Sequence, residues 1–332
     1  MIKLSVIIPT RNRAPTLERA LASFAGQTFP KDEFEVIVVD NGSTDRTAEV
    51  CARTSSLFIH FRRLYDEHPG LHVGRNLGME CAQAEILVYG DDDIEASPEW
   101  LESIYQSFAN PDVVLVGGKN LPVFEAPPPE WIEHLWAPNA SGERICGPLS
   151  ILDLGDNPRR ISPYKVYGCN FSIRKPVLLA AGGVHPDGMP KELIRFRGDG
   201  ETHVSRFIDN QGLVAFYHPG ASVGHLVSRE RLTVEYFCQR SFNQGVSNSF
   251  AEFREKKVTG RRNRGVLRFL RGLITWVRLR NAAYPVARMV KATHLGYNFH
   301  QREYRRDPML RDWVHRVNFL GGNSYIKQSG SA

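Results

Sequence analysis

The chain has 332 residues, of which 42% are hydrophobic and 23% are charged, a composition typical of a folded globular protein and not of a disordered or collagen-like chain. Its net charge of +6 is unevenly distributed, because residues 254–316 hold 17 lysines and arginines against 4 acidic residues. No stretch reaches 18 uninterrupted apolar residues, and the apolar run at 4–8 is too short for a signal sequence. We therefore expect neither a membrane-spanning helix nor export.

Apolar runs and helical spacings alternate along the first 118 residues. Residues 3–8 predict a buried strand stopped by Pro9, and apolar residues at helical spacing after Pro15 predict a helix. Repeats of this pattern predict a mostly parallel α/β sheet with helices on both faces. Further strands are expected at 35–39, 57–61, 86–89 and 113–118, and further helices at 45–53, at 73–83 and from Ser97, the expected N-cap, with Pro98 at the first helical position.

The pattern becomes irregular after residue 118. Six prolines and two tryptophans lie between 122 and 148, which predicts a long excursion that is either a lid or a loop packed on the sheet. Regular structure is expected again as strands at 164–173 and 214–217 and as helices at 176–181 and 201–210.

Five cysteines stand singly, without C-x-x-C pairs or zinc-like spacing. This predicts neither a disulfide framework nor a structural metal, and it is typical of a protein of the reducing cytoplasm.

Polar clusters follow three of the predicted strands. Thr10-Arg11-Asn12 follows the first strand, Asp40 ends the second, and Asp91 to Asp93 follow the strand at 86–89. Ligands of open α/β sheets bind at the carboxyl ends of parallel strands, so one crevice could hold all three clusters.

Three adjacent aspartates at a strand end repel one another unless a cation neutralises them. No cationic residue lies nearby in the sequence, so we expect the partner to be an ion from outside the chain. Oxygen ligands suit Mg²⁺ or Mn²⁺, which complete their coordination with water and substrate phosphates, and this favours a diphosphate substrate. The alternative is a solvated acidic turn before a helix.

Other candidates each have a functional and a structural interpretation. Asp199 and Glu201, at a predicted helix start, could supply a general base or could cap the helix. His225 could be a metal ligand or a hydrogen-bonded polar residue. Asp40 could bind a ligand or cap its turn, and Arg75 could contact a phosphate or base or pair with a neighbouring acid.

The order of these clusters is more specific than any one of them. The clusters occur in the order and at about the separations found in family-2 glycosyltransferases, the inverting nucleotide-sugar enzymes with the GT-A fold. The chain resembles this family over roughly residues 3–245. The segments that carry the resemblance are LSVIIPTRNRAPTLERAL, VIVVDNGSTDRT, GRNLGMECAQAEILVYGDDDIEASPEWL, YGCNFSIRK and FRGDGETHVSRFIDNQG.

The resemblance implies roles for individual residues. Asp91 and Asp93 match the D-x-D motif, whose carboxylates meet the ribose and a Mn²⁺ or Mg²⁺ that bridges the diphosphate, with Asp92 as an alternative ligand. His225 matches a further metal ligand of some members, and Arg240 matches a diphosphate-binding position. The residues matching the base and ribose pocket are Pro9, Thr10, Arg11, Asp40 and Arg75.

The Glu-Asp pair that supplies the catalytic base in this family is replaced by Gly198-Asp199-Gly200-Glu201. The base is therefore Asp199 or, with a small local shift, Glu201. The implied reaction is transfer of a sugar from a nucleotide sugar, by expectation a UDP-sugar, to a carbohydrate, lipid-linked or other hydroxyl acceptor. The carboxylate deprotonates the acceptor hydroxyl, which attacks the anomeric carbon with inversion.

The resemblance divides the chain into a nucleotide-sugar-binding half at 1–118, an acceptor-binding and catalytic half at 119–250 and a basic, mainly helical extension at 251–332. Within the extension, 265–290 mixes arginines with apolar residues. This segment is either a basic amphipathic helix on an anionic membrane surface, giving a cytoplasmic protein peripheral to the inner face, or a helix packed on the catalytic domain. We expect no nucleic-acid partner.

Two other functions remain in competition. A nucleotidyltransferase of similar fold would carry a glycine-rich phosphate loop after the first strand, where this chain has Pro9-Thr10-Arg11-Asn12. A non-catalytic protein that binds a nucleotide or sugar is supported by the altered Glu-Asp pair.

Overall fold

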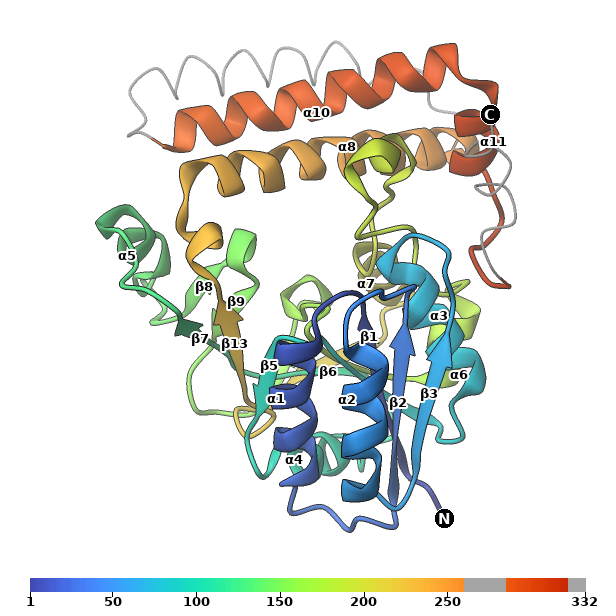
Figure 1. Cartoon of the computed structure of the whole chain (residues 1–332). Helices are drawn as coiled ribbons and strands as arrows, with labels where there is room; N and C mark the ends of the chain where they lie inside the picture. Colours follow the sequence, from blue (N-terminus) through green and yellow to red (C-terminus); the bar gives the residue numbers. More distant parts are fainter. Residues whose placement is uncertain (260–284, 322–332) are drawn as a thin grey trace. The chain divides into compact units, whose positions relative to one another are not determined.

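The computed structural model describes residues 1–259 and 285–321, and these residues form two compact units (Figure 1). Each unit is described by itself. Unit 1 comprises Met1–Gly188, Gly200–Ser228 and Asn318–Ala332, of which the last is described as far as residue 321, and unit 2 comprises Met189–Asp199 and Arg229–Val317.

Unit 1 contains an eight-stranded sheet with the order β10-β12-β6-β11-β4-β1-β2-β3. Strands β4, β1, β2 and β3 are parallel neighbours, β12 is parallel to β6, and β11 runs antiparallel between β4 and β6. The prediction of a mostly parallel sheet is therefore confirmed. The strands are β1 (Leu4–Thr10), β2 (Phe34–Asp40), β3 (Phe61–Tyr65), β4 (Ile86–Gly90), β6 (Val113–Gly117), β10 (Arg159–Ile161), β11 (Asn170–Arg174) and β12 (Val214–Tyr217).

Helices cover both faces of this sheet because successive strand residues point to opposite sides. In β1, Val6 and Ile8 pack with α1, α2 and α4 in one core cluster, whereas Ile7 packs with α3, α6 and α7 in another. The expected helices on both faces are therefore present. They are α1 (Ala14–Ala25), α2 (Thr47–Thr54), α3 (Leu71–Cys81), α4 (Trp100–Ser107), α6 (Lys175–Ala180) and α7 (Thr202–Asn210).

Helix α3 lies unusually close to its strand neighbours because two glycines face them. A Cβ atom on Gly78 would lie 2.3 Å from Ile7 Cγ2, and one on Gly74 would lie 2.4 Å from Asn41 Oδ1. These distances are far below van der Waals contact, so any side chain at either position would push α3 away from β1 and from the loop after β2.

A second sheet in unit 1 replaces the expected irregular excursion. Its order is β5-β13-β7-β9-β8, and most of it comes from residues 119–160. The strands are only three to five residues long, so the sequence lacks the apolar runs that mark longer strands. The elements are β5 (Ile94–Ala96), β7 (Asn120–Phe124), α5 (Glu130–Trp136), β8 (Arg144–Cys146), β9 (Ile151–Asp153) and β13 (Val223–Val227).

Several predicted bounds are wrong for local reasons. β1 continues through Pro9 to Thr10, paired with β2, and β11 begins only at Asn170 because a 3-10 turn occupies Pro163–Lys165. The third strand is β3 and not 57–61, since this edge strand is half-exposed and lacks an apolar run. Ser97 is not the N-cap of α4, which begins at Trp100; instead the Ser97 carbonyl accepts a hydrogen bond from Trp100 N.

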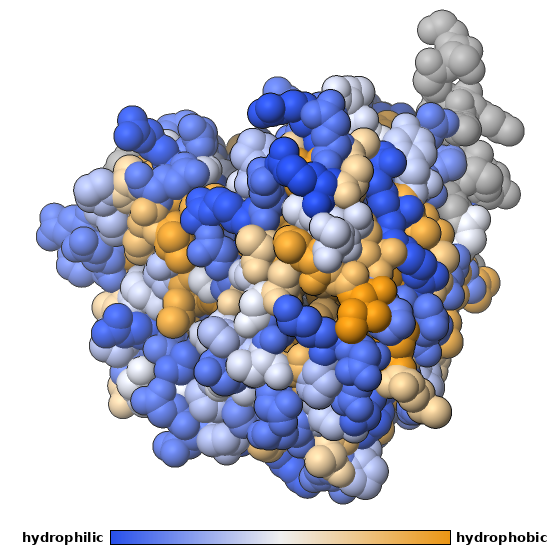
Figure 2. All heavy atoms as spheres, turned by 60° about the horizontal axis from the view of Figure 1, so that its bottom comes forward, coloured by the Kyte–Doolittle hydropathy of each residue, from blue (hydrophilic) through white to orange (hydrophobic). Residues whose placement is uncertain are grey.

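Figure 2 looks onto the end of unit 1 where the parallel strands begin, because β1, β2 and β3 point upward in Figure 1 and its lower end is turned forward. Hydrophilic residues cover much of this face, and hydrophobic residues show between them. Exposed apolar side chains such as Ile59 are ordinary on a folded protein. The polar residues that follow the strands lie at the opposite, carboxyl ends.

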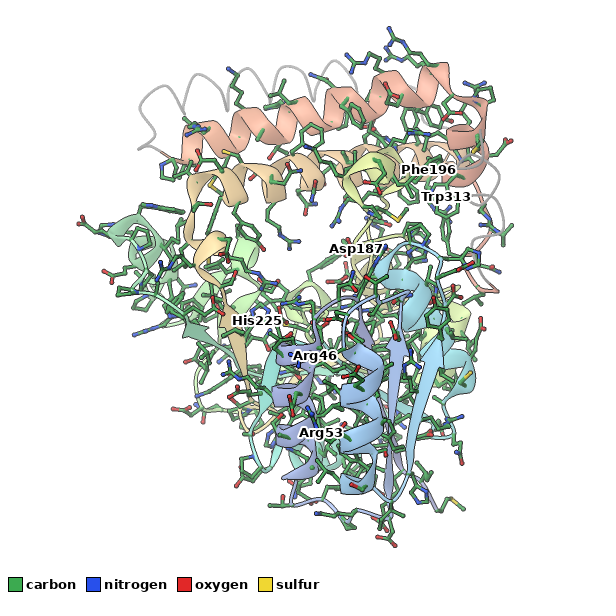
Figure 3. All side chains as sticks on the ribbon, in the orientation of Figure 1. Arg46, Arg53, Asp187, Phe196, His225 and Trp313 are labelled. Atoms are coloured by element: carbon green, nitrogen blue, oxygen red, sulfur yellow. The ribbon has the colours of Figure 1, made fainter. Side chains whose placement is uncertain are left out.

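Unit 2 is built on α8 (Val234–Thr259) and α10 (Val286–Arg306), which pack side by side and run in the same direction. Gly296 allows this approach, since a Cβ there would lie 1.9 Å from the Phe242 carbonyl oxygen. The short helix α11 (Pro308–Val314) follows, and its Trp313 donates a hydrogen bond to the Phe196 carbonyl (Figure 3).

The expected basic amphipathic segment at 265–290 lies mostly outside the described residues. Among the helices that the structure does describe, none combines the length and apolar character needed to cross a membrane.

Candidate active site

The loops after β1 and β2 are tied together. Asn12, at a positive φ of 54°, accepts a hydrogen bond from Thr44 N at 2.7 Å and donates its own N–H to Ser43 Oγ at 2.9 Å. Since β1 lies between β2 and β4, Thr10, Asp40 and the aspartate triplet follow three neighbouring strands. Thr10 Oγ1 donates to Asp92 Oδ2 at 2.7 Å, which joins the first cluster directly to the third.

The aspartate triplet has a cationic partner within the chain, which was not expected from the sequence. Arg13 Nη1 lies 3.2 Å from Asp92 Oδ1, and Arg13 Nη2 lies 2.9 Å from Asp93 Oδ2. Asp92 and Asp93 are buried, whereas the side chain of Asp91 is 28% exposed. Arg13 was overlooked because it follows β1, 80 positions from Asp93, and only the fold brings the two together.

Burial raises the pKa of the Asp92 carboxyl to about 7, and the charge of Asp93 adds to this, while Arg13 and the Thr10 hydroxyl act in the opposite direction. Burial alone lowers the pKa of the Arg13 guanidinium, but the carboxylates of Asp92 and Asp93 outweigh it and raise that pKa. Burial therefore makes the charge of Asp92 costly.

Arg75 connects the triplet to the second half of the chain. Its side chain is 4% exposed; Nη2 donates to Asp91 Oδ1 at 3.1 Å, and Nη1 donates to Glu201 Oε2 at 3.3 Å. Burial opposes its charge, but Asp91, Glu201 and Asp187 together raise the pKa of the guanidinium. Arg75 thus stays cationic between three carboxylates.

The Glu201 carboxylate does not cap α7, although Glu201 occupies the N-cap position. Instead it accepts hydrogen bonds from Arg75 and, through Oε1, from Gly168 N at 3.3 Å. Gly168 leaves the space for this arrangement, because a Cβ there would lie 2.5 Å from Arg75 Nη2. The sequence analysis did not single out Gly168, although the Tyr-Gly-Cys-Asn segment of the resemblance contains it.

Asp40 is fully buried, and both of its carboxylate oxygens have partners. Oδ1 accepts from Ser43 N at 2.8 Å, which is the turn-capping interaction, and Oδ2 accepts from Arg63 Nη2 at 2.6 Å. Arg63 belongs to the edge strand β3, whose position was mispredicted, so this partner was missed. Of the other residues at the end of β1, Pro9 is buried and Arg11 is exposed.

The second sheet brings His225 to the triplet. His225, labelled in Figure 3, lies on β13 and is buried. Its Nε2 lies 3.4 Å from Asp93 Oδ1, and the next residue, Leu226, donates its N–H to the Asp93 carbonyl. Asp93 is therefore held between a histidine and an arginine.

The donor atoms of this cluster fit a hard divalent cation that also binds the substrate. Within residues 1–259 and 285–321, no three histidine, cysteine or acidic side chains converge closely enough to hold a metal by themselves. Mg²⁺ and Mn²⁺ commonly use only one or two carboxylates and fill the remaining positions with water and phosphate oxygens. Asp93 with His225, and the more open carboxylate of Asp91, suit that kind of binding.

Asp199 and Arg240 belong to unit 2, whereas Glu201 belongs to unit 1 together with the triplet. Asp199 is buried, and Arg240 is half-buried on α8. Of the two candidate bases, the structure thus brings Glu201 into the network of Arg75 and Asp91.

Residues 5–177, more than half of the chain, match the model of the family described as glycosyl transferase family 2. The chain belongs to this family. Within unit 1, the match includes the triplet and Arg75 and ends before Glu201 and His225. These two residues are thus placed by the geometry of unit 1.

Two relatives from Haloferax volcanii illustrate the range of similarity. The chain is 38% identical over 116 residues to glycosyltransferase AglE, a match covering 35% of this chain and 38% of AglE. It is 27% identical over 261 residues to a glucosyl-dolichyl phosphate glucuronosyltransferase, covering 74% of this chain and 76% of that protein.

The fold is shared with a solved mannosyltransferase structure. The mannosyltransferase PcManGT from Pyrobaculum calidifontis, solved in complex with GDP-Man and Mn²⁺, superposes with a TM-score of 0.54 at 18% identity, covering 94% of this chain and 84% of that one. The expected GT-A type architecture is confirmed.

Proposed function

We propose that this chain is an inverting glycosyltransferase that moves a sugar from a nucleoside diphosphate sugar, by preference a UDP-sugar, to an acceptor hydroxyl. One observation carries the proposal: Arg75 binds both Asp91, the first carboxylate of the D-x-D motif, and Glu201, the candidate base. A donor-binding group and a proton-accepting group are thereby held at a fixed separation, as a transfer reaction requires.

The nucleoside is proposed to bind at the ends of β1 and β2, where Pro9, Thr10, Arg11 and Asp40 lie, and Asp91 is proposed to meet the ribose. Asp93, with His225 or Asp91 beside it, would hold Mn²⁺ or Mg²⁺ together with water and phosphate oxygens, and the ion would offset the negative charge of the leaving diphosphate. Arg240 stays a proposed diphosphate contact on the resemblance alone.

Glu201 is proposed to be the general base, with Asp199 as the alternative. Its Oε1 and Oε2 are each held by one donor, Gly168 N and Arg75 Nη1, so the carboxylate has a fixed orientation. The acceptor hydroxyl gives its proton to this carboxylate while its oxygen forms a bond to the anomeric carbon. The bond from that carbon to the diphosphate oxygen breaks, and the configuration inverts.

A lipid-linked saccharide is the acceptor class that we favour. The relative aligned over 74% of this chain is named for a dolichyl phosphate-linked sugar. In addition, α10 packs one side on α8 and exposes basic side chains on others, which favours peripheral attachment to an anionic membrane. These exposed residues are Arg288, Lys291, Arg302, Arg305 and Arg306.

Donor screening tests the proposal. A panel of nucleotide sugars with Mn²⁺ should contain one that raises the melting temperature of the chain, and that donor should release its nucleoside diphosphate when acceptors are added. Asp93→Ala should abolish this release, whereas Glu49→Gln, at an exposed carboxylate on α2, should leave it unchanged. Binding of nucleotide without turnover over a broad acceptor set would instead support the non-catalytic binding protein.

A further inference from the structure

The last described residues of the chain return to unit 1 and contact α3. The Phe319 ring lies 6.2 Å from the His72 ring, measured between centroids, the Phe319 carbonyl accepts from Asn76 Nδ2 at 3.1 Å, and Gly321 N donates to Glu80 Oε1 at 3.2 Å. His72, Asn76 and Glu80 are spaced by four residues and therefore share one face of the helix. Residues 319–321, here called the strap, thus follow α3 for two turns.

The contact is buried and specific. Phe319 is 2% exposed, and its ring also lies 5.2 Å from that of His185, between centroids. Asn76 accepts from Val184 N at 2.8 Å and donates to the Val184 carbonyl at 3.0 Å, so its amide links the strap, α3 and the segment before α7. Gly183, at a positive φ of 80°, allows Leu320 to pack, because a Cβ there would lie 2.5 Å from Leu320 Cδ2.

The strap contacts one face of α3, and Arg75, which belongs to the candidate site, lies on the adjacent face. Gly74 and Gly78 allow α3 to lie close to β1 and to the loop after β2. Arg75 extends from the same helix to Asp91 and Glu201. Gly168 leaves no spare room around the Arg75 guanidinium. A shift of α3 by a few tenths of an ångström would therefore alter both hydrogen bonds of Arg75.

We propose that the strap, with Phe319 as its main contact, positions Arg75 by fixing α3, and that residues 319–321 are thereby part of what completes the site of unit 1. The effect on sugar transfer rests on the proposed function. The effect on α3 and Arg75 does not depend on that function, so the strap proposal and the proposed function can fail separately.

The first test uses the full-length chain with Phe319→Ala. Hydrogen exchange of the α3 amides should become about 10-fold faster or more, because the helix loses a buried contact along one face. Affinity for UDP with Mn²⁺ and kcat/KM for the identified donor should both fall about 10-fold, since a displaced Arg75 affects ground state and transition state. Phe319→Leu should restore most of each loss.

The matched control is Phe29→Ala. Phe29 is also 2% exposed and packs against Phe34 and Tyr105, away from α3. Phe29→Ala should lower the melting temperature about as much as Phe319→Ala does, yet leave hydrogen exchange of the α3 amides and UDP affinity unchanged. If Phe319→Ala and Phe29→Ala change α3 exchange and UDP affinity equally, the strap is an ordinary part of the core and the proposal is wrong.

A double-mutant cycle with Arg75→Lys separates the two proposals. If the strap acts through Arg75, Phe319→Ala should weaken UDP binding about 10-fold in the parent chain and less than about 2-fold in Arg75→Lys. Additive effects would overturn the positioning role. If the effects of Phe319→Ala and Arg75→Lys on UDP binding are coupled but the chain transfers no sugar, the positioning role of the strap is supported and the proposed function is contradicted.

Discussion

Arg75 Nη1 lies 3.3 Å from Glu201 Oε2, although 126 positions separate the two residues. The other terminal nitrogen of the same guanidinium lies 3.1 Å from Asp91 Oδ1. A single side chain of α3 therefore links the acidic turn after β4 to the start of α7. The planar fork of arginine makes this possible, because it presents two donors in fixed directions.

Arg75→Lys should preserve a positive charge but lose one of these two contacts. A lysine ammonium offers its donors from one nitrogen and lacks the fixed fork of the guanidinium, so it should hold Asp91 and Glu201 together less well. We expect kcat/KM for sugar transfer to fall about 100-fold or more, with weaker nucleotide binding, measured by steady-state kinetics and by titration with UDP and Mn²⁺. Arg46→Lys, at an exposed arginine before α2, is the control and should leave both quantities unchanged (Figure 3).

Gly168→Ala should disturb the same network from the other side. The added Cβ would lie 2.5 Å from Arg75 Nη2 and must displace it, at a cost of about 1–3 kcal/mol in the free energy of unfolding. Chemical denaturation and kinetics should show both a loss of stability and a loss of transfer. Gly147→Ala is the matched control, since a Cβ there meets only Tyr167 Oη at 3.8 Å. Equal, small effects for both variants would contradict this account.

The sequence was sufficient for the parallel core and for most of the polar residues after its strands, because long apolar runs mark β1, β2 and β4. The sequence did not predict contacts between residues that lie far apart along the chain. Arg13, Arg63 and Gly168 acquire their partners only when distant segments meet, and nothing in their neighbouring residues signals this. The second sheet was missed for a related reason, since strands of three residues are set by their partners more than by their own composition.

Arg13→Gln tests how the charge of the triplet is balanced. Without Arg13, Asp92 and Asp93 lose the arginine that offsets their charges, and the pKa of the Asp92 carboxyl should rise further, so that it takes up a proton near neutral pH. The metal-free chain should lose about 1–3 kcal/mol of stability, less than for a fully buried pair because the Arg13 side chain is 40% exposed. A divalent cation should then compensate. We expect Mn²⁺ to raise the melting temperature more in Arg13→Gln than in the parent chain, and an identical response would argue against a metal at the triplet.

Asp92→Asn should change how stability depends on pH. Folding raises the pKa of the Asp92 carboxyl from its ordinary value of 3.8 to about 7, so its protonated form favours the folded state. That contribution is fully present below about pH 4 and is lost as the pH rises to about 7, a decline of about 2–4 kcal/mol in metal-free protein. Denaturation in EDTA at several pH values should show a smaller decline for Asp92→Asn; parallel curves would contradict the assignment.

We infer that Glu201 accepts the proton of the acceptor hydroxyl and that Arg75, which holds Glu201, also holds Asp91 on the donor side of the site. Glu201→Gln and Asp199→Asn, compared for UDP-sugar affinity and for single-turnover transfer with the identified donor and acceptor, test it most directly. We expect Glu201→Gln to keep donor affinity within about 3-fold and to lower the transfer rate by about 1,000-fold or more, while Asp199→Asn retains substantial transfer. The opposite pattern, with transfer lost in Asp199→Asn and kept in Glu201→Gln, would contradict it.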